Sequence, residues 1–158
     1  MAEPEHSALA KQGTEAIARW REERYWRRRR LDLSGASLSG ARLVNADLSR
    51  DDLSRIDLTN ADLRLADLSR ANLQAAHLWR SNIAHANLTG ANLASAALGR
   101  TNLAGSSLQG ADLRRADLTS ADLSRANLSS ANLAGADLTG ANLSWASLHG
   151  ADLSNAKM

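Results

Sequence analysis

The chain has 158 residues, which is enough for one domain with a short lead-in. It contains no cysteine, which excludes disulfide bonds and thiolate metal sites. It has no apolar run long enough to cross a membrane and no hydrophobic signal-peptide core at its start, so we expect a cytoplasmic protein without a membrane partner.

The net charge of +2 is distributed unevenly along the chain. Residues 1–30 carry eight Lys and Arg against five Glu, whereas residues 31–158 carry eleven Lys and Arg against twelve Asp. The lead-in is therefore basic, with a charge of +3, and the remainder is nearly neutral, with a charge of −1.

The lead-in, residues 1–30, is expected to contain a helix that covers the start of the following segment. Its polar beginning with Pro4 suggests a loose terminus, but the stretch from about Ser7 onward is rich in helix formers. One face of that helix would carry Leu9, Gly13, Ile17, Trp20 and Arg24.

The end of the lead-in combines aromatic and basic residues. Trp20, Tyr25 and Trp26 are expected to pack within the cap. The run Arg27–Arg30 suits a phosphate or an acidic partner, but it lacks interleaved aromatic residues and any recognisable nucleic-acid module. We interpret it as a solvated face, leave open whether it has a role, and expect no direct nucleic-acid binding.

Residues 31–158 form one unbroken repeat with a period of five. A large apolar residue, nearly always Leu, occupies every fifth position from Leu33 to Met158. A small residue, usually Ala, lies two positions before it, and Asp or Asn commonly stands between them. Each unit therefore reads A-D/N-L-x-x.

A period of five fits neither an α-helix nor a flat strand. On a helix the leucines would spiral around every face, and on a strand they would alternate between the two sides. Within a unit, however, Ala and Leu are two positions apart and share one side of a short extended segment. A turn after each unit keeps both residues inside, so the sequence predicts a solenoid with a Leu–Ala core and no internal cavity.

Units such as ADLSRANL, ANLTGANL and ANLAGADL resemble those of the pentapeptide-repeat family. The resemblance implies an all-β solenoid, a right-handed quadrilateral β-helix with four units per coil, preceded by an N-terminal capping α-helix. About six and a half coils, each rising by ~4.8 Å, would give a rod on the order of 30 Å long.

Two departures from the repeat stand out in its first half. Asp51 occupies an inward position where Ala is usual, so we expect either local distortion or hydrogen bonds from backbone amides to its carboxylate. The second departure is a surface cluster, and we consider it a possible partner-binding surface because Trp and Arg dominate binding hot spots. The alternative is surface drift, with the indole lying flat over Gly99. The cluster comprises His77, Trp79, Arg80 and Arg100.

The last coil is expected to expose apolar residues and unpaired backbone groups at its open end. Such edges tend to pair with another chain, so we expect a homodimer through the C-terminal coil. Alternatively, the polar tail Asn155–Lys157 covers the opening and the protein is a monomer. The residues at this possible dimer end are Leu143, Trp145, Leu148, His149, Leu153 and Met158.

The sequence gives little support for catalysis or for a cofactor. His6, His77, His85 and His149 lie in the lead-in or on different faces of the coil, so we expect no metal site. The Asp residues follow the repeat, and we find no nucleophile elbow and no phosphate-binding glycine loop. We therefore expect a non-enzyme without a cofactor.

Three functions remain open. The first is a rigid macromolecular binding scaffold with a protein partner of unknown identity. The second follows from the family resemblance: a DNA mimic that modulates or protects a type II topoisomerase, DNA gyrase. This role requires strongly negative faces, which the nearly neutral repeat lacks. The third is a purely structural or dimerisation unit.

Overall fold

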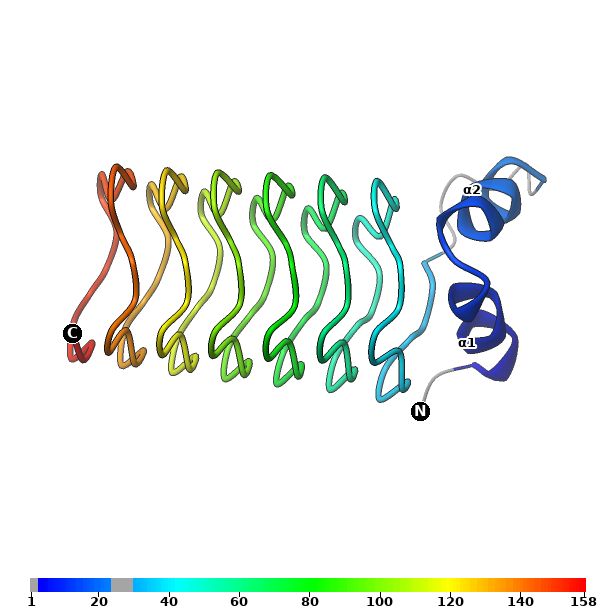
Figure 1. Ribbon diagram of the computed structural model, residues 1–158, viewed down its shortest axis with the longest axis horizontal. Helices are drawn as coiled ribbons and strands as arrows, with labels where there is room; N and C mark the ends of the chain where they lie inside the picture. The colour runs from blue at the N-terminus through cyan, green and yellow to red at the C-terminus, as the bar shows by residue number, and fades with distance from the viewer. Residues whose placement is uncertain (1–2, 24–29) are drawn as a thin grey trace.

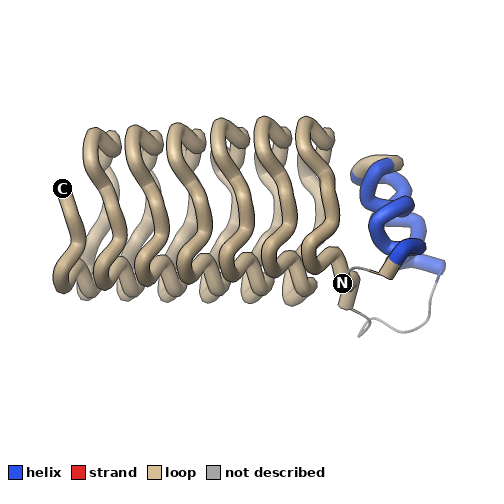
Figure 2. The backbone as a smooth tube through the Cα atoms, turned by 90° about the horizontal axis from the view of Figure 1, so that it is seen from below, coloured by secondary structure: helices blue, strands red, loops and turns tan. Residues whose placement is uncertain are grey.

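The structure, a computed structural model, describes residues 3–23 and 30–158. Residues 31–158 wind into a solenoid whose coils stack in one row, and two helices lie at its N-terminal end (Figures 1 and 2). Single parallel β-bridges join residues that are twenty apart, for example Asp32 to Asp52 and Asp137 to Lys157. Four such bridges per coil give it four sides, which confirms the predicted register.

Backbone hydrogen bonds connect each coil to the next on every side. The Leu33 N–H donates to the Asp52 carbonyl at 2.8 Å, and the Asp52 N–H donates to the Leu31 carbonyl at 3.0 Å. Within a coil, the Ala36 N–H donates to the Leu33 carbonyl at 3.0 Å and closes the corner. Each unit thus pairs its backbone with neighbouring coils, as a stable solenoid requires.

The core consists of the inward Leu and Ala residues. Leu63, Leu88, Leu113 and Leu128 are all 0% exposed, as the five-residue register predicts. Burying one such side chain contributes about 1.5–3 kcal/mol, but only when the coils on both sides cover it. Stability therefore depends on stacking along the rod.

In most units, an Asp or Asn shapes the corner that follows. Its side-chain oxygen accepts a hydrogen bond from the backbone N–H two residues later, as from Ser49 to Asp47 at 3.0 Å and from Ala104 to Asn102 at 3.0 Å. The next residue takes a left-handed conformation, even at Leu65, where φ is 61°. Such turns explain why the repeat favours these two residue types.

The lead-in forms two helices, α1 (Pro4–Lys11) and α2 (Thr14–Glu23), rather than the single helix expected. The chain breaks at Gly13, which has a φ of +90°. Pro4 begins α1 and is not part of a loose terminus, because proline suits the first turn of a helix. None of the helices within the described residues is long and apolar enough to cross a membrane.

The two helices cover the first coil, as expected of a cap (Figure 1). Ala10 and Ile17 are buried in the core, and Leu9 and Trp20 pack against it while partly exposed. Arg24, Tyr25, Trp26 and Arg27–Arg29 lie outside the described residues, so their predicted roles stay untested. Arg30 is described and exposed.

Candidate functional site

The structure brings the predicted surface cluster together on one side of two neighbouring coils. His77, Trp79 and Arg80 belong to one coil, and Arg100 occupies the same position as Arg80 in the next. Trp79 is 39% exposed, and the Arg80 guanidinium lies 4.1 Å from the centroid of the indole ring. This geometry is a cation–π contact, which holds both side chains at the surface.

Gly99 provides the space into which Trp79 packs. A Cβ atom at Gly99 would lie only 3.2 Å from Trp79 Cδ1 and 3.3 Å from Thr119 Oγ1. The other glycines of the chain all have positive φ, whereas Gly99 does not, so its backbone does not require glycine. The indole therefore lies against Gly99, as the alternative interpretation expected, yet remains substantially exposed.

The residues at the possible dimer end lie several coils away and do not join this cluster. Leu143, Leu148 and Leu153 are only partly buried, unlike the leucines of the inner coils. Trp145 is 88% exposed and Met158 is 72% exposed, and His149 is also exposed. These residues form a separate apolar end.

Asp51 joins the cap to the first two coils. Its Oδ1 accepts a hydrogen bond from the Leu31 N–H at 2.8 Å, as expected for an amide donor, and its Oδ2 lies 2.6 Å from Arg21 Nη2. Arg21 Nε also donates to the Asp47 carbonyl at 2.9 Å. Sequence reasoning missed Arg21, because its position depends on how α2 docks onto the coil.

The Asp51 carboxyl is fully buried, and this burial changes its protonation. Desolvation raises the pKa of Asp51 to about 7. The Arg21 charge and the Leu31 amide oppose the increase, whereas the charge of Asp47 adds to it. Asp51 is therefore a titratable contact between α2 and the coil, and its bonds to Arg21 and Leu31 hold the cap in place.

His6 supplies a second polar contact of the cap that the sequence did not reveal. Its Nδ1 accepts a hydrogen bond from the Asp32 N–H at 3.1 Å, and its ring packs edge-on against Trp20 with centroids 5.3 Å apart. The Glu3 N–H donates to the Asp32 carbonyl at 3.3 Å. These bonds occupy backbone groups that a preceding coil would otherwise pair.

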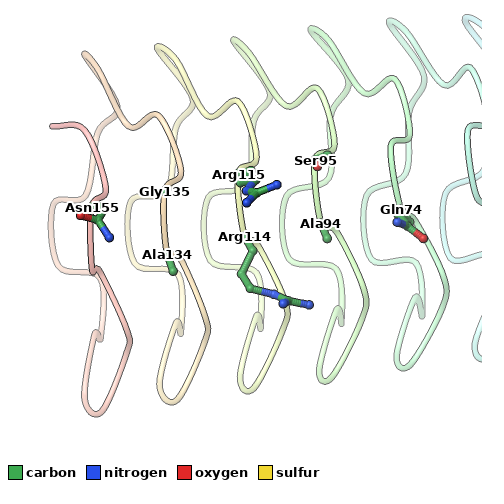
Figure 3. A pocket seen from close by; sticks show the side chains of 8 residues that line it. All are labelled: Gln74, Ala94, Ser95, Arg114, Arg115, Ala134, Gly135 and Asn155. Carbon is green, nitrogen blue, oxygen red and sulfur yellow. The ribbon is translucent and has the colours of Figure 1, made fainter.

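A shallow open hollow runs along another side of the rod (Figure 3). Arg114 and Arg115 project from one coil between the small residues of neighbouring coils. Arg114 is held by Asp112, with an Nη2–Oδ2 distance of 2.6 Å. Among the described residues, no group of three His, Asp or Glu side chains is placed to hold a metal ion. The residues that line the hollow are Gln74, Ala94, Ser95, Arg114, Arg115, Ala134, Gly135 and Asn155.

The family model for pentapeptide repeats matches the chain in eight copies, over residues 29–64, 52–90, 66–103, 96–133 and 126–158. Proteins with this repeat form right-handed quadrilateral β-helices, which agrees with the four-sided coil described above. No curated protein sequence is significantly similar to the chain.

Several solved structures of pentapeptide-repeat proteins are similar to the chain. HetL, involved in heterocyst differentiation regulation in the cyanobacterium Nostoc sp. strain PCC 7120, is 33% identical; the match covers 82% of this chain and 77% of HetL, with a TM-score of 0.36. Rfr23 from the cyanobacterium Cyanothece 51142 is 30% identical, with coverages of 87% and 95% and a TM-score of 0.38. A trypsin-treated variant of QnrB1, a plasmid-mediated fluoroquinolone resistance protein, is 25% identical, with coverages of 77% and 76% and a TM-score of 0.47.

Proposed function

Because this chain belongs to the pentapeptide-repeat family, we propose that it is a non-enzymatic, rigid scaffold whose outer faces bind another protein. The interior supports this proposal, since Leu and Ala side chains fill the inner coils and leave the outer faces for recognition. The observation that carries it is Trp79, a large aromatic residue held at the surface by Arg80 and Gly99. Exposed aromatic residues beside Arg are typical anchors of protein interfaces.

A pull-down from the cells that produce the protein tests this function. The full chain serves as bait, and a pentapeptide-repeat protein of similar length serves as the control bait. A binding scaffold should enrich a protein that the control does not, and the complex should form again from the purified components. If no protein is enriched over the control, the scaffold function is wrong and a purely structural unit is favoured.

A second candidate is a DNA mimic that modulates or protects DNA gyrase, and the similarity to QnrB1 favours it. A DNA mimic needs faces with dense negative charge, because duplex DNA carries one charge per ~1.7 Å of its axis. The repeat carries −1 in total. We therefore rank this role below a general protein scaffold.

We also propose that a second copy covers the apolar end formed by the last coil. No backbone partner is present within the described residues for the N–H groups of Leu143, Leu148 and Leu153, and their side chains are partly exposed. A two-fold contact would bury both edges and close on itself. Sedimentation at several protein concentrations tests the dimer, and a single monomeric species at high micromolar concentration would contradict it.

A further inference from the structure

The middle of the rod contains a band without acidic residues. Between Asp67 and Asp112 the sequence has no Asp or Glu, although acidic residues recur on both sides of this stretch. Residues 68–111 span slightly more than two coils, and we call them the acid-free band. The band carries Arg70, Arg80 and Arg100. The near-neutral rod therefore has a positive centre between two more acidic parts.

The fold does not require the acids to be absent from this band. In the corner turns, Asp117 accepts a hydrogen bond from the Thr119 N–H at 2.9 Å, and Asn102 accepts one from the Ala104 N–H at 3.0 Å. Asp and Asn side chains therefore stabilise the turn in the same way. A carboxylate would make these turns equally well within the band. Folding therefore does not explain the local charge, and a ligand of negative charge would.

The arginines of the acid-free band have no internal ion-pair partner among residues 3–23 and 30–158. By contrast, Arg64 and Arg114, one on each side of the band, pair with Asp62 and Asp112 at 2.7 and 2.6 Å. Because the side chains of Arg80 and Arg100 are exposed, an external anion can reach them.

Asp57 and Asp117 lie on the same side of the rod, one coil before and one coil after the two coils of the cluster, and among the described residues neither forms an ion pair with Arg80 or Arg100. Asp57 accepts the Thr59 N–H at 3.0 Å, and Asp117 accepts the Thr119 N–H at 2.9 Å. Arg70 lies half a coil away from Arg80, at the opposite corner of the four-sided coil, so it does not take part in the same surface.

On these grounds we propose that Trp79, Arg80 and Arg100 bind an acidic segment of a partner protein, an inference that rests on the scaffold function proposed above. The two guanidinium groups, one coil apart, would hold carboxylates of the segment, and the exposed part of the indole would contact its apolar atoms. Arg–carboxylate pairs form strong, directional hydrogen bonds. Two arginines are too few for a nucleic acid, whose affinity comes from many phosphate contacts.

Fluorescence anisotropy with a labelled hexa-aspartate peptide at low salt tests the site. The full chain should bind this peptide more tightly than a hexalysine peptide or a single-stranded oligo-dT. The variant Arg80→Gln/Arg100→Gln should weaken binding by about fivefold or more, and Trp79→Ala should do the same. Arg64→Gln/Arg114→Gln, which removes the same charge outside the band, should change affinity by less than about twofold.

Gly99→Thr tests the position of the indole without altering charge. Thr59 and Thr119 occupy the same position in other coils, so the coil accommodates threonine there, but its Cβ would lie 3.2 Å from Trp79 Cδ1 and force the indole to shift. Gly99→Thr should keep the thermal midpoint, weaken peptide binding by about fivefold, and have no further effect when Trp79 is already Ala.

Three results would overturn the proposal: equal loss in the Arg64/Arg114 control, no preference for hexa-aspartate over hexalysine, or tighter binding of oligo-dT. The pull-down separates this proposal from the scaffold function. If the Arg80→Gln/Arg100→Gln chain captures the same protein as the unchanged chain, the scaffold function holds and the proposed surface is wrong. If the unchanged chain captures nothing specific, the scaffold function fails as well.

Discussion

Replacing Arg21 by Ala should loosen the cap, because it leaves the buried Asp51 carboxyl without its cation. Asp51 would keep only the hydrogen bond from the Leu31 N–H. Removing one partner of a buried ion pair typically costs about 3–5 kcal/mol. Arg21 is 21% exposed, so we expect a loss at the lower end of that range, about 3 kcal/mol, at a pH where Asp51 is ionised.

The loss of stability in Arg21→Ala should depend on pH, because Asp51 changes its protonation between pH 4 and 7. Its pKa is raised from 3.8 to about 7, so the folded chain binds a proton that the unfolded chain has released between these values. Stability therefore falls as pH rises from about 4 to 7, by at most ~4 kcal/mol. At pH 5 the carboxyl is protonated, and Arg21→Ala should then cost only about 1–2 kcal/mol, from the lost hydrogen bonds to Asp51 and to the Asp47 carbonyl.

Asp51→Ala is the matched control, since Ala46 and Ala61 occupy equivalent inward positions. It removes the buried charge, leaves the Leu31 N–H without an acceptor, and should cost about 1–3 kcal/mol. It should also remove the decline in stability between pH 4 and 7. In the double variant, the loss of Arg21 should add only the ~1 kcal/mol of its hydrogen bond to the Asp47 carbonyl, because no buried carboxylate remains.

Urea unfolding at pH 5 and pH 8, together with hydrogen exchange of the Leu33 amide, measures these effects. The Leu33 amide belongs to the first coil and reports opening of the cap, whereas the Leu103 amide reports the middle of the rod. Additive losses in the double variant, or an equal cost of Arg21→Ala at both pH values, would refute the buried-charge explanation.

The remaining predictions concern the core, the corner turns and the charge of the rod. Leu103→Asp should lower the free energy of unfolding by ~3 kcal/mol or more, because Leu103 is 0% exposed. The surface change Ser124→Ala should alter it by no more than roughly ±0.5 kcal/mol. Equal thermal midpoints for the two variants would contradict the inward position of Leu103. Hydrogen bonds from Thr139, with help from Lys157, lower the pKa of Asp137 to about 2, and those from Thr59 lower the pKa of Asp57. The stability that these carboxylates contribute should be complete above pH ~4 and lost toward pH 2. An acid titration followed by circular dichroism measures this loss, and the absence of a loss between these pH values would contradict the role of the corner turns. In a supercoiling assay, the chain should inhibit DNA gyrase poorly compared with strongly acidic relatives, and sub-micromolar inhibition would show that the charge argument is wrong.

The repeat could be predicted from the sequence because every unit poses the same packing problem. The spacing from Leu33 onward allows only one side of each short segment to face inward, and the bridges at twenty-residue intervals confirm this. The cap was predicted only in part. The break at Gly13 and the burial of His6 depend on contacts with the first coil, and no periodic pattern in residues 1–30 encodes them.

In the candidate surface, contacts that follow from the repeat could be predicted, whereas contacts that depend on side-chain conformation could not. The column that contains Trp79 and Gly99 follows from the twenty-residue coil, so their contact could be predicted. The stacking of Arg80 on the indole could not, since it depends on the rotamer of a long side chain. Asp51 could be identified as anomalous, but its partner Arg21 lies thirty residues away in a separate helix.

The bridges at constant twenty-residue intervals make the length of the rod a modular variable. Deleting one whole coil, such as 121–140, brings together backbone groups that are geometrically equivalent to the pair that was lost. Every later residue would then keep its side of the rod. Deleting a single unit of five would instead rotate all later side chains by one side, so surfaces formed by several coils would be taken apart while the core stayed filled. Such a chain can therefore gain or lose whole coils during evolution and keep its binding faces. A gain or loss of one five-residue unit instead moves the residues of a binding face to different sides of the rod.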